Sequence, residues 1–100
     1  MPQNPSKEKE IATQRIHKLF YEAKQIFNTD SKLSDRYVHL ARKIAMKFKV
    51  RIPPILKRKF CKHCYTYLVP SKNLRIRLHK SRVIYLCLKC KRFMRFPYKN

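Results

Sequence analysis

The chain has 100 residues, which is enough for one small domain or for a small domain with a helical arm. Its 26 Lys and Arg against 5 acids give a formal net charge of +21. No apolar run approaches the roughly 18 residues of a membrane span. We therefore expect a soluble protein with no membrane partner, and the charge favours a polyanion as ligand.

The acids are confined to the start of the chain. All five lie within the first 35 residues, where six Lys and Arg leave a net charge of +1. Residues 36–100 contain 20 Lys and Arg and no carboxylate side chain. These cations repel one another unless a polyanion neutralises them. Nucleic acid is the default partner; an anionic membrane surface is the weaker alternative, because the cations also occupy a strand-rich region.

Two amphipathic helices are predicted first, over about residues 6–28 and 34–49, because apolar side chains recur there at helical spacing. Ser31 or Ser34 is expected to cap the second helix. The short loop between them makes the helices antiparallel neighbours in an arm over residues 6–50. Their apolar surplus either covers the rest of the chain or binds a protein partner. The partner residues expected are Ile11, Ile16, Leu19, Phe20, Ile26, Phe27 and Tyr37.

A basic linker over residues 51–59 follows, and Pro53 ends the second helix. Residues 60–98 are then rich in strand formers. Strict alternation places Leu74, Ile76 and Leu78 on one sheet face, and Arg75 and Arg77 on the other. The strands predicted are 66–69, 74–78, 82–86 and a short edge strand over 93–98.

Four cysteines organise this second half: Cys61 and Cys64, then Cys87 and Cys90 after 22 intervening residues. Two C-x-x-C turns supply the four thiolates that tetrahedral zinc prefers. Disulfides fit poorly, because the first residues lack the apolar segment of a secretory signal and a reducing, cytoplasmic location is expected. Four thiolates close the coordination shell, so one structural Zn²⁺ is predicted. His63, between the first pair, is better explained as a loop residue than as a ligand.

The predicted fold is therefore small α+β: an antiparallel two-helix arm followed by a four-cysteine zinc ribbon with a small antiparallel sheet. The chain has no glycine. Tyr65 and Lys91, directly after the two cysteine turns, occupy positions that often need positive φ and therefore glycine. Either these turns take another geometry, or metal ligation holds them in a strained one.

Protein-based catalysis is not expected, because His39, His63 and His79 have no following carboxylate to orient them. Phosphate-binding arginines and lysines are expected on the ribbon and its linker. Tyr67, Tyr85 and Phe93 are candidates to stack on unpaired bases, although core packing is the stronger interpretation for Tyr85. The predicted RNA-binding residues are Arg75, Arg77, Arg82, Lys72, Lys80, Lys89, Lys91, Arg92, Arg95, Arg51, Lys57, Arg58 and Lys59.

Several segments together resemble a known family, over roughly residues 34–98. They are Leu33-Ser34-Asp35-Arg36-Tyr37-Val38, Ala41-Arg42-Lys43-Ile44-Ala45-Met46, Arg51-Ile52-Pro53, Lys57-Arg58-Lys59-Phe60-Cys61-Lys62-His63-Cys64, Leu68-Val69-Pro70, Arg75-Ile76-Arg77 and Cys87-Leu88-Lys89-Cys90. This pattern resembles the fourth protein component of archaeal ribonuclease P and its eukaryotic counterparts. The family tends to place glycine at the positions of Ser71 and Lys91, where this chain departs from it.

The resemblance implies a non-catalytic subunit of the ribonucleoprotein endonuclease that removes 5′ leaders from precursor tRNA. It further implies that Mg²⁺ acts only through the catalytic RNA, and that the chain binds the specificity domain of that RNA. It implies a heterodimer with a second protein subunit that has an Sm-like barrel, contacted by the N-terminal helices. The alternatives are a ribosomal zinc-ribbon protein that binds rRNA and a stand-alone nuclease, which the lack of acids after Asp35 disfavours.

Overall fold

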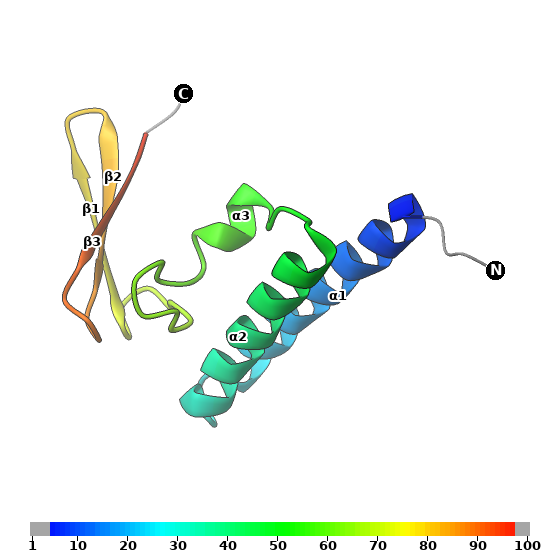
Figure 1. The fold of residues 1–100 in the computed structure, drawn as a ribbon. Coiled ribbons are helices and arrows are strands. Elements are labelled where there is room, and N and C mark those ends of the chain that lie inside the picture. The colour runs from blue at the N-terminus through cyan, green and yellow to red at the C-terminus, as the bar shows by residue number, and fades with distance from the viewer. Residues whose placement is uncertain (1–4, 98–100) are drawn as a thin grey trace.

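The structure, a computed structural model, describes residues 5–97 and places a helical hairpin and a small sheet at opposite ends of the molecule (Figure 1). The loops that carry the cysteines lie between them, and the principal extents are 52 × 34 × 20 Å. The elements are α1 (Pro5–Ile26), α2 (Ser31–Phe48), α3 (Pro54–Lys57), β1 (Leu74–His79), β2 (Arg82–Cys87) and β3 (Phe93–Pro97). The predicted small α+β architecture is confirmed. Within residues 5–97, no helix combines the length and the apolar character needed to cross a membrane.

The turn between α1 and α2 differs from the expectation in its capping residue. Asp30 is the N-cap of α2, and its carboxylate accepts a hydrogen bond from the backbone N–H of Leu33 at 3.1 Å. The prediction of Ser31 or Ser34 as the cap is therefore wrong. Ser34 lies inside α2, where its buried hydroxyl donates to the carbonyl of Ala23 at 2.8 Å and joins the two helices.

One apolar cluster, here called the arm core, joins the helices to the first cysteine turn. The Phe20 ring lies 5.7 Å from the Phe60 ring, and the Phe27 ring lies 6.1 Å from the Tyr67 ring. The apolar stripe of α1 therefore covers part of the ribbon. The buried members of this cluster are Ile16, Phe20, Ala23, Val38, Ala41, Ala45, Ile52, Leu56, Phe60 and Tyr67.

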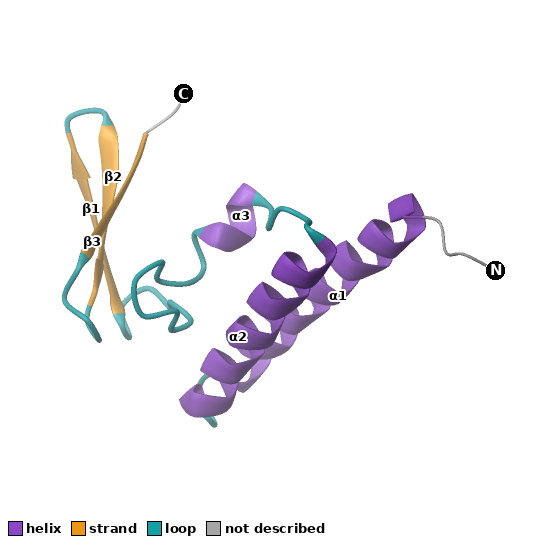
Figure 2. Cartoon of the chain, viewed as in Figure 1, coloured by secondary structure: helices purple, strands orange, loops and turns teal. Residues whose placement is uncertain are grey.

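The connection between the arm and the sheet contains two departures from the sequence-based expectation. Pro54 begins the one-turn helix α3, which was not predicted, because proline's fixed φ and missing N–H suit the first helical position. Residues 66–69 were predicted as a strand, which is wrong: only the isolated bridge Phe60–Tyr67 forms there. The chain between α3 and β1 is mostly loop (Figure 2). The predicted division at 6–50, 51–59 and 60–98 stays a prediction, and Tyr98 lies outside the described residues.

The sheet is antiparallel, with strand order β1-β2-β3. Its register pairs Arg75 with Leu86 and Leu86 with Phe93, and it pairs Arg77 with Ile84 and Ile84 with Arg95. Because paired residues point to the same side, arginines from β1 and β3 share one face. The opposite face contributes Leu74, Cys87 and Met94 to a second cluster, the ribbon core, whose other buried members are Cys61 and Leu68.

Candidate metal centre and RNA interface

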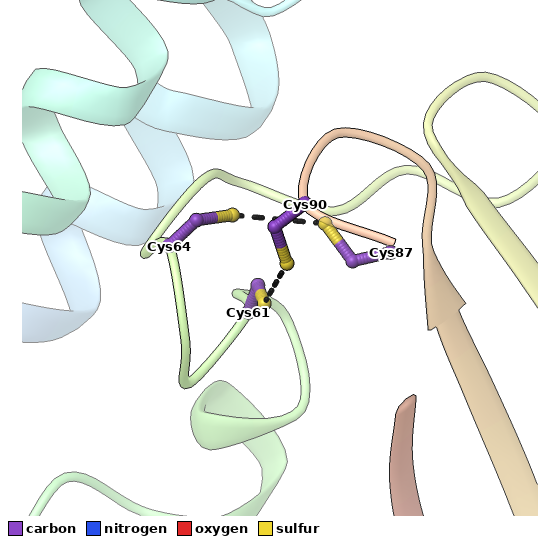
Figure 3. Close-up of side chains that lie close together, drawn as sticks. All are labelled: Cys61, Cys64, Cys87 and Cys90. Carbon is purple, nitrogen blue, oxygen red and sulfur yellow. Dashed lines mark hydrogen bonds between the residues drawn. The ribbon is translucent and has the colours of Figure 1, made fainter. Parts of the chain in front are cut away.

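The four predicted ligands converge at one point between the arm and the sheet (Figure 3). All four Sγ atoms lie within 4.8 Å of one another. The Sγ atoms of Cys61 and Cys90 are 3.6 Å apart, and those of Cys64 and Cys87 are 3.7 Å apart. Each close pair takes one sulfur from each turn, and all four cysteines are free thiols. The two turns therefore face each other across a single centre.

Each cysteine turn is closed by the same backbone hydrogen bond. The N–H of Tyr65 donates to the carbonyl of Cys61, and the N–H of Lys91 donates to that of Cys87, both at 2.8 Å. Tyr65 has φ 61° and Lys91 has φ 63°, so both occupy the left-handed region without being glycine. Of the two alternatives that the sequence left open for these turns, the structure has the one with positive φ at both positions. Ser71, where the resembled family tends to have glycine, also has positive φ, at 68°.

The geometry and chemistry of this donor set fit a tetrahedral metal ion. Four sulfurs each about 2.3 Å from a zinc ion lie about 3.8 Å from one another, close to the two spacings described above. Without a metal, burial raises the pKa of the Cys64 thiol to about 12, and hydrogen bonds with the other cysteines add to the rise. A cation would supply the charge that makes four adjacent thiolates stable, two of them buried and two half-buried. Four protein ligands leave no open position for a reacting water.

His63 does not join this donor set. Its imidazole is exposed, and Nε2 lies 3.4 Å from the carbonyl oxygen of Phe93. Its backbone N–H instead donates to the Sγ of Cys61 at 3.4 Å, a contact that stabilises negative charge on the sulfur. His63 is therefore a residue of the turn, as predicted, and it connects the first turn to the start of β3.

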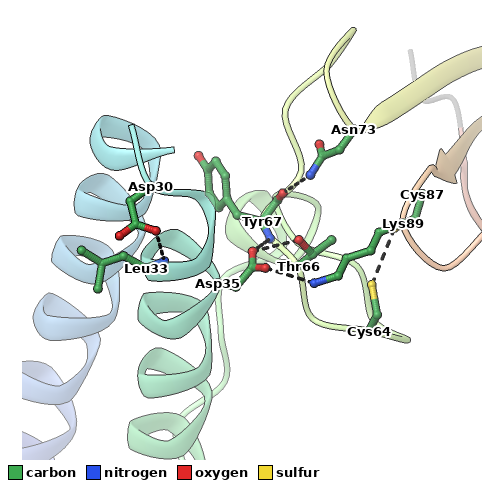
Figure 4. A network of polar contacts seen from close by, with 9 residues as sticks. All are labelled: Asp30, Leu33, Asp35, Cys64, Thr66, Tyr67, Asn73, Cys87 and Lys89. Atoms are coloured by element: carbon green, nitrogen blue, oxygen red, sulfur yellow. Dashed lines mark hydrogen bonds and ion pairs between the residues drawn. The ribbon is translucent and has the colours of Figure 1, made fainter. Parts of the chain in front are cut away.

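Asp35 is a residue whose role the sequence did not reveal (Figure 4). Its Oδ1 accepts hydrogen bonds from the Thr66 hydroxyl at 2.8 Å and from the Tyr67 N–H at 2.9 Å. Its Oδ2 lies 3.3 Å from the Nζ of Lys89. One carboxylate of α2 thus holds both the segment after the first cysteine turn and a lysine of the second turn. The last acid of the chain fixes the arm relative to the ribbon.

The predicted RNA-binding residues are not gathered on one surface. Arg75, Arg77 and Arg95 line two adjoining hollows on one face of the sheet, together with Ile84, Leu86 and Phe93. Arg82 pairs with His79 and Pro97 farther along the same face. Lys72, Lys80, Lys91, Arg92, Arg51 and Lys57 are exposed on the linker and on the turns.

Arg58 and Lys89, both predicted to bind RNA, contact side chains of other segments of the chain. The Arg58 guanidinium lies 4.6 Å from the centre of the Phe96 ring, on the face of the sheet that looks toward α3. Lys89 pairs with Asp35, although its side chain is 60% exposed. Lys59 is half-buried. Arg58 and Lys89 help to position the ribbon, and the assignment of all three residues to RNA stays a prediction.

The three aromatic residues considered for base stacking differ in how deeply they are buried. Tyr67 lies in the arm core, where burial raises the pKa of its phenol, so a stacking role for it is wrong. Tyr85 is half-buried and meets the Phe96 ring edge-on at 5.0 Å, which agrees with the core-packing interpretation. Phe93 is 48% exposed and faces the arginines.

The predicted partner-binding residues of the arm also differ in how deeply they are buried. Ile16 is 0% and Phe20 is 2% exposed, so their assignment to a partner surface is wrong: they form the arm core. Leu19, Phe27 and Tyr37 pack against that core and are half-buried, and Ile26 is also half-buried. Ile11 is 44% exposed. Exposed apolar side chains that the prediction missed are Tyr21 on α1 and Leu40 and Met46 on α2.

The fold and the site define a class of protein: a small metal-binding ribbon with a helical arm and a basic sheet face. The model of the RNAse P Rpr2/Rpp21/SNM1 subunit domain matches residues 15–91. The chain therefore belongs to this family of ribonuclease P subunits, which confirms the resemblance seen in the sequence.

Relatives with the name ribonuclease P protein component 4 are similar along most of the chain. The protein of Methanococcoides burtonii is 49% identical over 90 residues, which cover 90% of this chain and 83% of that one. The protein of Pyrococcus furiosus is 43% identical over 99 residues, which cover 95% of this chain and 85% of that one.

Solved structures agree with the fold. A chain in a cryo-EM structure of archaeal ribonuclease P with mature tRNA matches with a TM-score of 0.83 and 38% identity, covering 89% of this chain and 78% of that one. A structure named Pfu Rpp21 matches with a TM-score of 0.61 and 40% identity, covering 87% of this chain and 99% of that one.

Proposed function

We propose that this chain is an RNA-binding, non-catalytic subunit of ribonuclease P that helps the catalytic RNA to remove the 5′ leader of precursor tRNA. Family membership is the observation on which the proposal rests. The physical chemistry agrees with it. A closed four-sulfur site has no position for substrate, and the Asp35 carboxylate, which contacts the residues after the first cysteine turn and a lysine of the second, is occupied by structural hydrogen bonds.

The metal in this proposal is one structural Zn²⁺ held by Cys61, Cys64, Cys87 and Cys90. Its support is the choice of four thiolates as donors together with sulfur spacings of 3.6 and 3.7 Å. The ion fixes both cysteine turns and, through Cys87, the end of β2. Mg²⁺ belongs to the catalytic RNA in this scheme, and the expected compartment is the cytoplasm.

The partners proposed are the specificity domain of ribonuclease P RNA and a second protein subunit with an Sm-like barrel. Charge separates the two surfaces. The sheet and the turns are free of acids, which suits phosphate. The exposed side of α1 mixes signs, with Glu10, Arg15 and Lys18, and adds the exposed apolar residues Ile11 and Tyr21. A mixed-sign surface with exposed apolar side chains suits a protein.

Reconstitution tests the proposal. The metal-loaded chain is added, with and without a barrel subunit, to ribonuclease P RNA and precursor tRNA over a Mg²⁺ titration. We expect the chain to lower the Mg²⁺ concentration needed for cleavage, because its cations replace part of the counterion requirement of the folded RNA. Omitting the RNA must abolish cleavage. The proposal fails if no combination of partners shifts the titration, or if the chain cleaves without RNA.

A further inference from the structure

Phe93 is a large aromatic side chain that the described residues 5–97 cover only in part. It begins the edge strand β3, and 48% of its surface is exposed. The next residue, Met94, points to the other side of the sheet and is buried in the ribbon core. The alternation of the strand therefore does not require an aromatic residue at position 93, since the ribbon core is filled from the opposite face.

Around Phe93, apolar side chains lie on the central strand β2, and arginines lie on the two outer strands. Leu86 lies beside it in the sheet register, and Ile84 lies one pair farther along the same face. A hollow of about 510 Å³ is lined by Arg77, Leu78, His79, Ile84, Phe93 and Arg95. A second hollow of about 160 Å³ is lined by Arg75, Arg77, Ile84, Leu86 and Phe93. Arg77, Ile84 and Phe93 border both, so the two hollows adjoin, and together they are here called the groove.

The arginines of the groove lie beside the Phe93 ring and leave part of the ring face uncovered. The Arg95 guanidinium lies 5.7 Å from the centre of the Phe93 ring. Arg75 and Arg77 rise from β1, on the other side of β2 from Phe93. An incoming planar group can therefore contact the exposed part of the ring while charged groups attached to it meet arginines on both sides.

We infer that an unpaired RNA base stacks on Phe93 in this groove, and that Arg75, Arg77 and Arg95 bind the phosphates next to it. The inference rests on the proposed RNA-binding function and names the part of RNA that this face takes. Base-paired RNA buries the faces of its bases within the helix, so an aromatic platform serves only unpaired nucleotides. An apolar protein segment is a poorer occupant, because it would bury three arginines without counter-charges.

A fluorescent variant tests the contact directly, because the chain contains no tryptophan. Phe93→Trp places a single indole on the platform. Ile76→Trp is the matched control, because Ile76 is 44% exposed and pairs with Tyr85 on the opposite face of the sheet. The metal-loaded variants are titrated with a short oligoadenylate, with an RNA duplex of equal length, and with an abasic oligomer of equal length. We expect the oligoadenylate to quench the indole at position 93 and not the one at position 76, with little quenching by the duplex or the abasic strand.

An affinity measurement separates stacking from charge. Removing a stacking partner weakens binding by roughly 5- to 150-fold per base, so Phe93→Leu is expected to lose that factor for the oligoadenylate and to keep its affinity for the abasic strand. The inference is overturned if Phe93→Leu binds the oligoadenylate normally, or if all three probes quench the Phe93→Trp variant equally. Either result leaves the proposed function standing, provided that the wild-type chain still lowers the Mg²⁺ requirement for processing.

Discussion

Among single residues, Asp35 shows how one side chain can join two parts of a small protein. Its carboxylate satisfies two donors that sit in a buried segment, the Thr66 hydroxyl and the Tyr67 N–H. A buried donor left without an acceptor costs about 1–3 kcal/mol. The Lys89 contact adds less, because that lysine is mostly exposed and its charge is screened by water.

Replacing Asp35 by alanine should lower the free energy of unfolding by about 2–4 kcal/mol, because two donors lose their acceptor. Asp35→Asn should cost less, since the amide oxygen can still accept from both donors. Lys89→Met should cost no more than about 1 kcal/mol. Denaturant unfolding of the metal-loaded variants measures the three values. If Asp35→Ala is no worse than Lys89→Met, the carboxylate does not join the arm to the ribbon.

Lys91 illustrates a residue held in an unfavourable backbone conformation. Its φ of 63° lies in the left-handed region, which costs a residue with a Cβ about 1–2 kcal/mol. Lys91→Gly should therefore raise the free energy of unfolding by about 0.5–1 kcal/mol, after the extra backbone entropy of glycine in the unfolded chain is subtracted. Thermal unfolding should show a higher midpoint than in wild type.

Lys62→Gly is the matched control for this change. Lys62 is also an exposed lysine in a cysteine turn, but it is not among the residues with positive φ. Glycine there brings only the entropy cost, so the midpoint should fall. If both variants fall, the left-handed conformation of Lys91 stores no removable strain.

Lys91 and Asp35 differ in how much of their structural role could be predicted from the sequence. The C-x-x-C pattern marks Tyr65 and Lys91 as positions where positive φ is common, but it leaves open whether residues with a Cβ adopt it. The contacts of Asp35 join residues 31, 32 and 54 positions apart. No local pattern specifies such pairs. The most informative sequence hint was that Asp35 is the last acid before 20 uncompensated cations.

Among the elements, the periodicity of apolar residues predicts the helices and the β1–β2 hairpin. It does not predict which side chains these elements pack against. Periodicity places Phe20 within the apolar stripe of α1 and Ile11 at the edge of that stripe, two and a half turns away, which agrees with the 44% exposure of Ile11. It cannot tell that Phe20 meets Phe60. Residues 66–69 have the composition of a strand, yet their backbone bonds go to α2, to Lys59 and to Asn73 instead of to a sheet. Tertiary contacts therefore determine both what the apolar stripe of α1 packs against and where the backbone of residues 66–69 forms its hydrogen bonds.

The metal should support the elements unequally. The ribbon core contains Cys61 and Cys87 themselves, so the ion and the packing of the sheet depend on each other. Chelation is expected to remove the dispersed amide signals of residues 60–97. The helical signal of α1 and α2 should persist, because Ser34 and the apolar stripe join these helices to each other.

Circular dichroism and amide spectra before and after chelation, with zinc added back, measure this difference. Phe60 and Tyr67 belong to the arm core, so the helices should also unfold at a lower denaturant concentration once the ribbon is lost. Amide spectra that remain unchanged after complete metal removal would contradict a structural role for the ion.

For the whole molecule, the positions of the charges matter more for RNA binding than the net charge does. Twenty Lys and Arg follow the last acid, and those within the described residues are spread over α2, the linker, the turns and the sheet. Such a surface binds phosphate mainly by releasing counterions, so affinity falls as salt rises. The position of each cation then decides whether it touches RNA or only adds to the long-range field.

Changing two cations on the sheet should therefore differ from changing two on the arm. The logarithm of affinity for structured RNA should fall with the logarithm of salt by about 0.7–0.9 per phosphate contact. Replacing both Arg75 and Arg77 with alanine should flatten the slope by about 1.4–1.8, since each arginine contributes one contact. Arg15→Ala with Lys18→Ala removes the same charge from an exposed part of α1 and should leave the slope nearly unchanged. Equal slopes for the two double variants would place the phosphate contacts outside the sheet.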